Sequence, residues 1–295
     1  ERGLLPLLKL LRIVLAWVGV RWPLGLREGS KEDQEDQEEA GLPGVPLPWP
    51  RELSSLQPLA QLPSGVTSIS FSSCSWFLFF HIGVSECLLR SLGPEALEHV
   101  SFYGSSCGSL MAATLACGVD TRDLLALGME MVDFASHRFL GPTGAMTHIV
   151  SSGLHRLLPE RAAEMATGRL FVSISSLEDG IPRQWLVSEF SSKADLVNCL
   201  LASCYIPIYY ETPCTVRGKV CVDGGLTAPQ PVSSTGRTVT VDAGLLGFQA
   251  DITPQSRLPF HLAFFPRCRE EYLSIYREGF AACERWLAHS RQGTS

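Results

Sequence analysis

"YGSSCGSL", residues 103–110, is the stretch that determines the fold expected for this chain. It contains the pattern Gly-x-Ser-x-Gly centred on Ser106, with Gly104 and Gly108 on either side. A short strand is predicted before it at residues 100–103, and a helix after it at residues 109–118. A serine on a sharp strand-to-helix turn exposes its hydroxyl, and flanking glycines leave room for the turn. We therefore expect Ser106 to be a catalytic nucleophile, with an ordinary Gly/Ser turn as the alternative.

Strands and helices alternate on both sides of this unit. Apolar runs rich in β-branched residues predict the strands, and apolar residues at helical spacing predict the helices. Such alternation favours a mainly parallel sheet covered by helices on both faces, which is an α/β fold with three layers, α/β/α. The further strands are expected at residues 66–71, 169–176, 184–190, 219–225 and 237–243, and the further helices at residues 79–92, 193–204 and 270–289.

A nucleophilic serine needs a group that takes its proton. Asp223 in "KVCVDGG" follows an apolar strand and precedes Gly224 and Gly225, which let the chain turn sharply. The carboxyl ends of parallel strands gather at one edge of a sheet, so Asp223 and Ser106 are expected to meet there. An Asp-Gly-Gly turn without a catalytic role is the alternative, and His261 in "PFHLAFF" is the best candidate for a histidine base.

Composition and cysteine usage exclude several other classes of protein. Hydrophobic residues make up 45% of the 295 residues and the net charge is −6, without a Lys/Arg stripe, which argues against a nucleic-acid binder. The ten cysteines include no C-x-x-C pair, and His, Cys and carboxylates do not cluster at ligand spacing. We expect neither a metal nor another cofactor, and we interpret the cysteines as reduced thiols in an intracellular protein.

The first 65 residues differ from the rest and are interpreted as an N-terminal extension. Residues 1–27 hold five basic residues among apolar ones, residues 28–40 hold seven acids, and residues 41–50 are rich in proline. The folded domain is expected to span residues 66–289, followed by a tail at residues 290–295. Charges interrupt the first apolar stretch, so an amphipathic membrane-surface segment or a mitochondrial targeting peptide fits it better than a transmembrane helix. A stretch without a specific role is an equal alternative.

Several stretches together carry a resemblance to a known family. "SISF", "YGSSCGSL", "RLFVSISS", "LVSEFSSKADLVNCLLASCYIPIYY" and "RGKVCVDGGLT" occur in the order found in patatin-like phospholipase domains. The chain is most similar to the branch of adipose triglyceride lipase and adiponutrin, including its shorter members. The resemblance covers roughly residues 67–287. It implies a three-layer α/β/α fold and a Ser–Asp dyad without histidine, in which Ser106 is the nucleophile and Asp223 the proton acceptor.

One motif of that family is altered here. The family has a loop of the form Gly-x-Gly-x-x-Gly whose backbone N–H groups stabilise the oxyanion, and Ser73, Ser75 and Leu78 stand at its glycine positions. Backbone donors remain, so Ser73, Cys74 and Ser75 are the expected oxyanion residues, together with the N–H of Cys107 after the nucleophile. Holding a serine at a positive φ costs roughly 1 kcal/mol.

The resemblance implies a serine lipid acyl hydrolase of the triacylglycerol lipase, phospholipase or retinyl ester hydrolase type, with transacylation as a further possibility. The altered loop leaves a second interpretation open, a catalytically silent member that binds lipid surfaces or a partner. A third is an α/β hydrolase with a Ser–Asp–His triad through His261. The expected partners are a neutral lipid or phospholipid and a membrane or lipid-droplet surface. The expected location is the cytoplasm with peripheral membrane association, or the mitochondrion.

Overall fold

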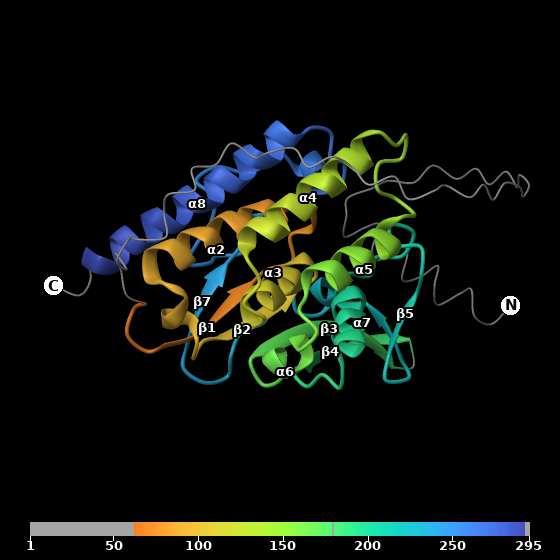
Figure 1. The fold of residues 1–295 in the computed structure, drawn as a ribbon, viewed down its shortest axis with the longest axis horizontal. Coiled ribbons are helices and arrows are strands. Elements are labelled where there is room, and N and C mark those ends of the chain that lie inside the picture. The colour runs from red at the N-terminus through yellow and green to blue at the C-terminus, as the bar shows by residue number, and fades with distance from the viewer. Residues whose placement is uncertain (1–61, 179, 293–295) are drawn as a thin grey trace, which may run out of the picture. The chain divides into compact units, whose positions relative to one another are not determined.

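The central sheet contains seven strands in the order β5–β6–β3–β2–β1–β7, with β4 paired to β3. Strands β3, β2, β1 and β7 are parallel neighbours, whereas β4 and β6 are antiparallel to β3, and β5 is antiparallel to β6. The predicted α/β class with a mainly parallel central sheet is therefore confirmed (Figure 1). The strands are β1 (Val66–Phe71), β2 (Ser101–Ser105), β3 (Leu170–Glu178), β4 (Ile181–Val187), β5 (Cys214–Val216), β6 (Lys219–Val222) and β7 (Arg237–Val241).

The computed structural model describes residues 62–178 and 180–292. The predictions for the N-terminal segments 1–27, 28–40 and 41–50 lie outside the described residues. All ten cysteines lie within them; they are free thiols, and eight of them are buried. No helix in the two described stretches is both long and apolar enough to cross a membrane.

Seven α-helices pack around this sheet in the described residues. The helices expected after β1, after Ser106, before β5 and at the C-terminal end are present, and the last of them runs on to Gln292. Residues 119–168, for which no element is predicted above, form three further helices. The helices are α2 (Leu78–Leu92), α3 (Cys107–Ala116), α4 (Thr121–Ser136), α5 (Met146–Leu157), α6 (Ala162–Ala166), α7 (Lys193–Cys204) and α8 (Arg269–Gln292).

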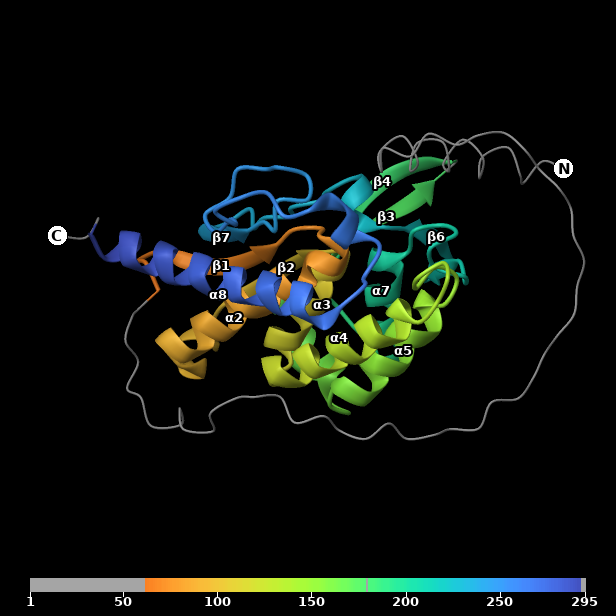
Figure 2. The same ribbon diagram turned by 90° about the horizontal axis from the view of Figure 1, so that it is seen from above.

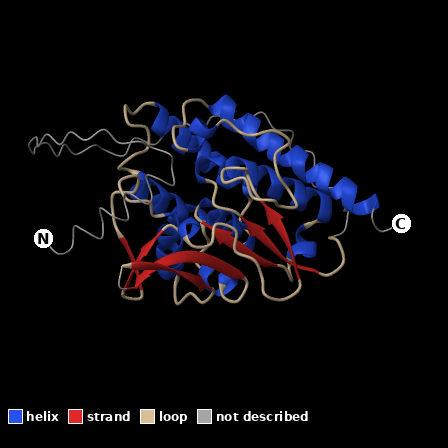
Figure 3. Cartoon of the chain, turned by 180° about the vertical axis from the view of Figure 1, so that it is seen from behind, coloured by secondary structure: helices blue, strands red, loops and turns tan. Residues whose placement is uncertain are grey.

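The two faces of the sheet are covered differently. Successive side chains of a strand point to opposite faces, so Ile69 and Phe71 of β1 face one way and Ser68 and Ser70 the other. Helices gather on one face of the sheet, as the view from above shows (Figure 2). Phe71 faces these helices, because its ring lies 5.3 Å from that of His81 in α2. From behind, connecting segments cross the opposite face (Figure 3). The third layer thus consists of connecting segments and short 3-10 turns rather than long helices.

Serines on the second face bond these connecting segments. In β1, Ser70 donates to the carbonyl of Pro231, whereas Ser68 shares a 2.7 Å hydrogen bond with Thr238 of the neighbouring strand β7. In β3, Ser175 shares a 2.8 Å hydrogen bond with Thr227. All three serines are buried. Side-chain hydrogen bonds of Ser70 and Ser175 therefore attach the segment between β6 and β7 to the sheet.

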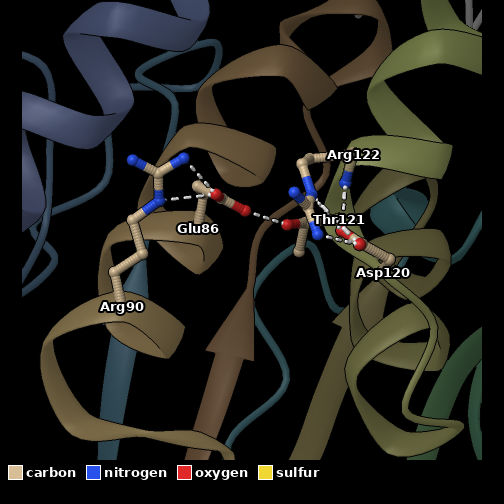
Figure 4. A network of polar contacts seen from close by, with 5 residues as sticks. All are labelled: Glu86, Arg90, Asp120, Thr121 and Arg122. Carbon is tan, nitrogen blue, oxygen red and sulfur yellow. Dashed lines mark hydrogen bonds and ion pairs between the residues drawn. The ribbon is translucent and has the colours of Figure 1, made fainter. Parts of the chain in front are cut away.

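A buried carboxylate links α2 to the start of α4 (Figure 4). Glu86 of α2 is only 7% exposed, accepts a hydrogen bond from the Thr121 hydroxyl and lies 2.6 Å from Nε of Arg90. Thr121 is the first residue of α4, and the side chain of Asp120 caps that helix by accepting the N–H of Arg122 at 2.9 Å. The contact fixes where α4 begins relative to α2, and α4 forms part of the wall of the cavity described below.

Replacing Glu86 by alanine should destabilise the fold. The change removes the acceptor of two buried hydrogen bonds, one of them charge-assisted, so the free energy of unfolding should fall by about 2–3 kcal/mol in urea denaturation. Glu95→Ala is the matched control, because Glu95 is exposed in the short turn Pro94–Leu97. Equal stability of the two variants would contradict a structural role for the Glu86 network.

Candidate active site

Strands β2 and β6 run toward each other along the same side of β3. The last residue of β2, Ser105, pairs with Ser173, and the last residue of β6, Val222, pairs with Ser175. Strand β4 pairs with Val172–Glu178 from the opposite side, so β2 and β6 share one edge of β3. The pairing partners of the two strand ends are therefore two residues apart on β3. Ser106 is the residue that follows β2, and Asp223 is the residue that follows β6. Asp223 thus follows an antiparallel strand that meets β2 end to end, rather than a parallel neighbour as expected.

The glycines of both motifs lie where no side chain fits. A Cβ on Gly108 would lie 2.4 Å from the carbonyl oxygens of Phe71 and Ser72, and one on Gly104 would lie 2.5 Å from the carbonyl oxygen of Gly108. A Cβ on Gly224 would lie 2.0 Å from the carbonyl oxygen of Ser173. None of these glycines has a positive φ, so close backbone approach is what requires them.

Gly225 is crowded by the expected oxyanion loop. A Cβ at this position would lie 2.5 Å from Oγ of Ser73 and 2.8 Å from Oδ1 of Asp223. The Asp-Gly-Gly turn and the loop after β1 are therefore in direct contact. The missing side chain of Gly225 lets both approach the strand end that carries Ser106.

Ser106 has a strained backbone that two buried partners hold in place. Its φ is 53° and its ψ is −135°, a combination that residues other than glycine rarely adopt. Its N–H donates to the hydroxyl of Ser203 at 2.9 Å, and that hydroxyl donates to the carbonyl of Ser173 at 2.7 Å. Strain of this kind persists where surrounding bonds over-determine it, and it is typical of functional sites.

Ser106 and Asp223 are in direct contact. The hydroxyl of Ser106 donates a hydrogen bond to Oδ2 of Asp223 over 2.6 Å, and the N–H of Gly225 donates to Oδ1 over 2.7 Å. Burial raises the pKa of Asp223 to about 7, although the hydrogen bonds from Ser106 and Gly225 act in the opposite direction. The pKa of this carboxyl therefore lies near neutrality, where it can both accept and release a proton.

The four expected oxyanion residues take different positions. Ser75 and Cys107 line the cavity next to Ser106, and Cys107 is the first residue of α3, where a helix has N–H groups without intrahelical acceptors. Ser75 has a φ of 49°, so serine occupies a left-handed conformation where the family has glycine. The N–H of Ser73 donates to the carbonyl of Pro229 at 2.8 Å, and its hydroxyl bonds Ser105 at 3.0 Å. The expectation for Ser73 is therefore corrected, because both of its donors are engaged.

Cys74 is buried and, unlike Ser75 and Cys107, does not line the cavity next to Ser106. Its side chain is 0% exposed, its sulfur lies 3.5 Å from Nδ1 of His81, and burial raises the pKa of its thiol well above the usual value. The contact between Cys74 and His81 attaches the loop to α2. We therefore assign the Cys74 side chain to holding the loop in place.

A narrow apolar cavity of about 60 Å³ opens beside Ser106. Its wall comes from the starts of α2 and α3, from α4 and α5, and from the segment after α7. Apart from Ser75, Ser106 and Cys107, most of the lining side chains are apolar; they include Phe79, Leu110, Met131, Met146 and Val150. The site therefore combines one hydroxyl that is hydrogen-bonded to a buried carboxylate with a wall suited to a hydrocarbon chain.

Comparison with known proteins agrees with this geometry. The profile of the patatin-like phospholipase family matches residues 69–235, which is more than half of the chain. The chain belongs to the patatin-like phospholipase family. Human omega-hydroxyceramide transacylase is 35% identical over 193 residues, which are 64% of this chain and 35% of that relative. Human patatin-like phospholipase domain-containing protein 4 is 31% identical over 247 residues, 75% of this chain and 96% of the relative.

These relatives confirm the resemblance to the adiponutrin branch of the patatin-like phospholipase family. The chain spans about a third of the length of the transacylase that it matches. Among solved structures, VipD from Legionella pneumophila aligns with a TM-score of 0.49 at 10% identity, covering 78% of this chain and 68% of VipD.

His261 does not take part in the arrangement around Ser106. It is exposed in the short turn Phe260–Ala263, and within residues 62–178 and 180–292 no histidine side chain is hydrogen-bonded to Ser106 or Asp223. The same residues contain no group of three or more His, Cys, Asp or Glu side chains that could hold a metal ion. The geometry therefore matches the dyad that the patatin-like resemblance implies, and not a Ser–Asp–His triad.

Ser203 is a residue of the site that the sequence motifs do not single out. It lies near the end of α7 in "NCLLASC", where it is a polar residue in an otherwise apolar stretch and is 0% exposed. A buried hydroxyl must find partners, which is the signal that points to a structural bond. Which groups it bonds depends on how α7 packs against β3, and a single sequence does not reveal that.

Replacing Ser203 by alanine should destabilise this patatin-like domain. The N–H of Ser106 and the carbonyl of Ser173 would both lose a buried partner, so the free energy of unfolding should fall by about 1–3 kcal/mol in urea denaturation. Ser152→Ala is the control, because Ser152 is exposed on α5. A Ser203 variant as stable as the control would show that the turn at Ser106 does not need this hydrogen bond.

Asp223 should make the stability of the fold depend on pH. Its pKa in the folded protein is about 7, above the value of about 3.9 expected in the unfolded chain. The folded state therefore binds the extra proton between these values, and stability falls as the pH rises from about 4 to about 7. The loss should be on the order of 3 kcal/mol.

The Asp223→Asn variant should lack this component of the pH dependence. The measurement is the difference in unfolding free energy between the chain and the variant across that pH range. Asp123→Asn, at an exposed position in the first turn of α4, is the control and should follow the unchanged chain. A constant difference between the chain and the Asp223 variant would refute the elevated pKa.

Proposed function

We propose that this chain is a serine lipid acyl hydrolase in which Ser106 is the nucleophile and Asp223 its proton acceptor. The observation that carries the proposal is the 2.6 Å hydrogen bond from the strained Ser106 to a buried carboxylate. Family membership supports acyl-ester chemistry, and a transacylase among the relatives supports acyl transfer as an alternative fate of the same intermediate.

The reaction uses the two residues twice. Oγ of Ser106 attacks the ester carbonyl carbon while Asp223 takes the hydroxyl proton. Collapse of the tetrahedral intermediate breaks the bond to the alcohol, which leaves with the proton from Asp223, and the acyl group stays on Ser106 as an ester. Water then attacks this ester and gives a proton to Asp223. Collapse of the second tetrahedral intermediate breaks the bond to Oγ of Ser106, which takes the proton back from Asp223, and the fatty acid is released; an alcohol in place of water completes a transacylation.

Two features support Asp223 as a base without histidine. An ordinary carboxylate is a weak base for a serine hydroxyl, whereas a pKa of about 7 brings Asp223 close to the pH at which a general base works best. The backbone N–H of Gly225 binds the other carboxylate oxygen, which holds the carboxylate plane in position.

The oxyanion would be stabilised by the backbone N–H groups of Ser75 and Cys107. Both residues line the cavity with Ser106, and the dipole of α3 adds partial positive charge at Cys107. The apolar wall behind them suits the acyl chain of the substrate, so we assign the substrate class as long-chain lipid esters. Triacylglycerols, phospholipids and retinyl esters all present this chain to the nucleophile.

A catalytically silent lipid-binding protein is the second candidate. One observation favours it, namely that the N–H of Ser73 is bound to Pro229 and leaves the site with one oxyanion donor fewer. Loss of one such donor lowers a rate by about 10²–10³-fold. Labelling of the nucleophile separates this candidate from an active enzyme.

Ser106 should react with a fluorophosphonate probe, since such probes trap activated serines. Labelling should disappear in Ser106→Ala and fall by at least about 100-fold in Asp223→Asn, which keeps the shape but loses the base. His261→Ala is the control and should be labelled like the unchanged chain. The labelling rate should increase as the pH rises through about 7, because Asp223 must be ionised to accept the proton.

Two results would contradict this assignment. Absence of labelling in a folded sample would favour the silent lipid-binding candidate. Labelling that depends on His261 but not on Asp223 would favour the triad. Labelled protein would next be tested on radiolabelled triacylglycerol, phospholipid and retinyl ester, each with and without an alcohol acceptor.

A further inference from the structure

Three segments meet at one side of the cavity and form a surface that we call the rim face. It consists of residues 134–144, 205–210 and 257–268. The N–H of Gly144 donates to the carbonyl of Tyr209 at 3.1 Å, and the hydroxyl of Tyr209 donates to the carbonyl of Phe264 at 3.0 Å. Tyr209 also lines the cavity next to Ser106, so the rim face adjoins the candidate active site.

A further contact joins the rim face to the helical layer. Arg269, at the start of α8, forms an ion pair with Asp133 near the end of α4. The end of α4 and the start of α8 accordingly lie along the same upper edge of the domain (Figure 1). The first and third segments are therefore held next to each other, and the third also contacts Tyr209.

The rim face exposes an unusual amount of apolar side chain. Six of the twelve large apolar side chains exposed in the described residues belong to these three short segments. Phe139 is 102% exposed and the other five are between 41% and 62% exposed. The six are Phe134, Phe139, Leu140, Ile208, Phe260 and Phe265. Apolar side chains gathered on one face beside a site are typical of a docking surface.

Ile208 is presented outward at the expense of backbone strain. Its φ is 76°, which is a genuine outlier for a β-branched residue, and its side chain is 56% exposed. The bridge between Pro207 and Tyr210 and the 2.9 Å bond from the N–H of Tyr210 to the carbonyl of Ile206 hold this turn. Folding alone gives no reason to strain a residue whose side chain then contacts solvent.

The rim face is basic although the whole chain has a net charge of −6. Its three segments contain Arg138, Arg257 and Arg267, together with His137 and His261, and no aspartate or glutamate. The ion pairs of the described residues involve other cations than these three arginines. Positive charge therefore remains available for an anionic partner.

The carboxylates next to the rim face lie outside its three segments. Asp133 is paired with Arg269, and Glu211 accepts the N–H groups of Thr147 and His148 at the start of α5, whereas Glu270 and Glu271 follow the third segment in the first turn of α8. None of these acids forms an ion pair with the three rim arginines in the described residues. Aromatic and aliphatic side chains mixed with arginine are the composition of segments that lie in the headgroup region of a bilayer.

We propose that the rim face docks the domain onto an anionic lipid surface, with Phe139, Leu140 and Ile208 inserted among the acyl chains and the three arginines at the headgroups. This inference rests on the proposed function in one respect. The purpose of docking would be to bring lipid esters to the mouth of the Ser106 cavity. Binding itself needs no turnover, so the two proposals can fail separately.

The charge of the rim face is tested by co-sedimentation of the full chain with vesicles. One set contains phosphatidylcholine alone and the other phosphatidylcholine mixed with phosphatidylserine. The triple variant R138A/R257A/R267A should bind the anionic vesicles about 100-fold more weakly, from about fivefold per arginine, while its weak binding to neutral vesicles changes little. The control triple variant R156A/R161A/R183A removes the same charge from other exposed positions and should bind like the unchanged chain.

The apolar part is tested by F139S/L140S, which should weaken binding to both kinds of vesicle by about tenfold or more. I181S/L186S, at exposed apolar positions of β4, is its control. Thermal unfolding of every variant establishes that it is folded. Equal binding by rim and control variants would overturn the proposal, and would assign any vesicle binding to other parts of the chain, including residues 1–27.

Ser106→Ala separates this inference from the proposed function. It should bind vesicles like the unchanged chain, because the hydroxyl does not belong to the rim face. Vesicle binding that needs the rim arginines, in a chain that no fluorophosphonate labels, would keep the docking surface and reject the hydrolase. If Ser106 is labelled but vesicle binding does not change when the rim arginines are replaced, the hydrolase is kept and the docking surface is rejected.

Discussion

Close approach of backbone segments around Ser106 is the constraint on which the rest of the structure depends. The start of α3 lies against the end of β1 so tightly that a Cβ on Gly108 would overlap two carbonyl oxygens, and the Asp-Gly-Gly turn lies equally tightly against β3. This crowding forces Ser106 into its strained conformation and leaves its hydroxyl within reach of Asp223. Ser106, the start of α3 and Asp223 are therefore positioned by the same contacts that join the layers.

The meeting of β2 and β6 explains why the carboxyl of Asp223 is buried next to Ser106. Both strands end against β3, so Asp223 is only 7% exposed and its carboxyl loses most of its hydration. That loss raises its pKa to about 7. In a triad, the imidazole supplies a base that titrates near neutrality; here, burial gives a carboxylate a similar pKa. The sheet thus gives Asp223 the pKa that the proposed dyad without histidine requires.

Local patterns predicted most of the sheet, because strand periodicity and the glycine motifs are properties of short stretches. The helices α4 and α5 were not predicted, since residues 119–168 contain many small and polar residues. The apolar faces of these helices can be recognised only once the cavity that they line is known. The bond from Ser73 to Pro229 and the role of Ser203 depend on contacts between segments far apart in the chain. The sequence therefore indicated Ser106 and Asp223 as candidate residues, whereas the cavity wall, the role of Ser203 and the engaged donors of Ser73 became visible only in the fold.

The serine-lined face of the sheet has a consequence for how stability varies with temperature. Burial of apolar surface in the helical layer gives unfolding a positive heat-capacity change, whereas burial of polar surface contributes with the opposite sign. Ser70 and Ser175 place polar surface between the sheet and the segment after β6, and Ser68 adds a buried polar contact with Thr238 of β7. This face lowers the net heat-capacity change per residue and flattens the stability curve, so the domain loses less stability on cooling than one whose sheet is apolar on both faces.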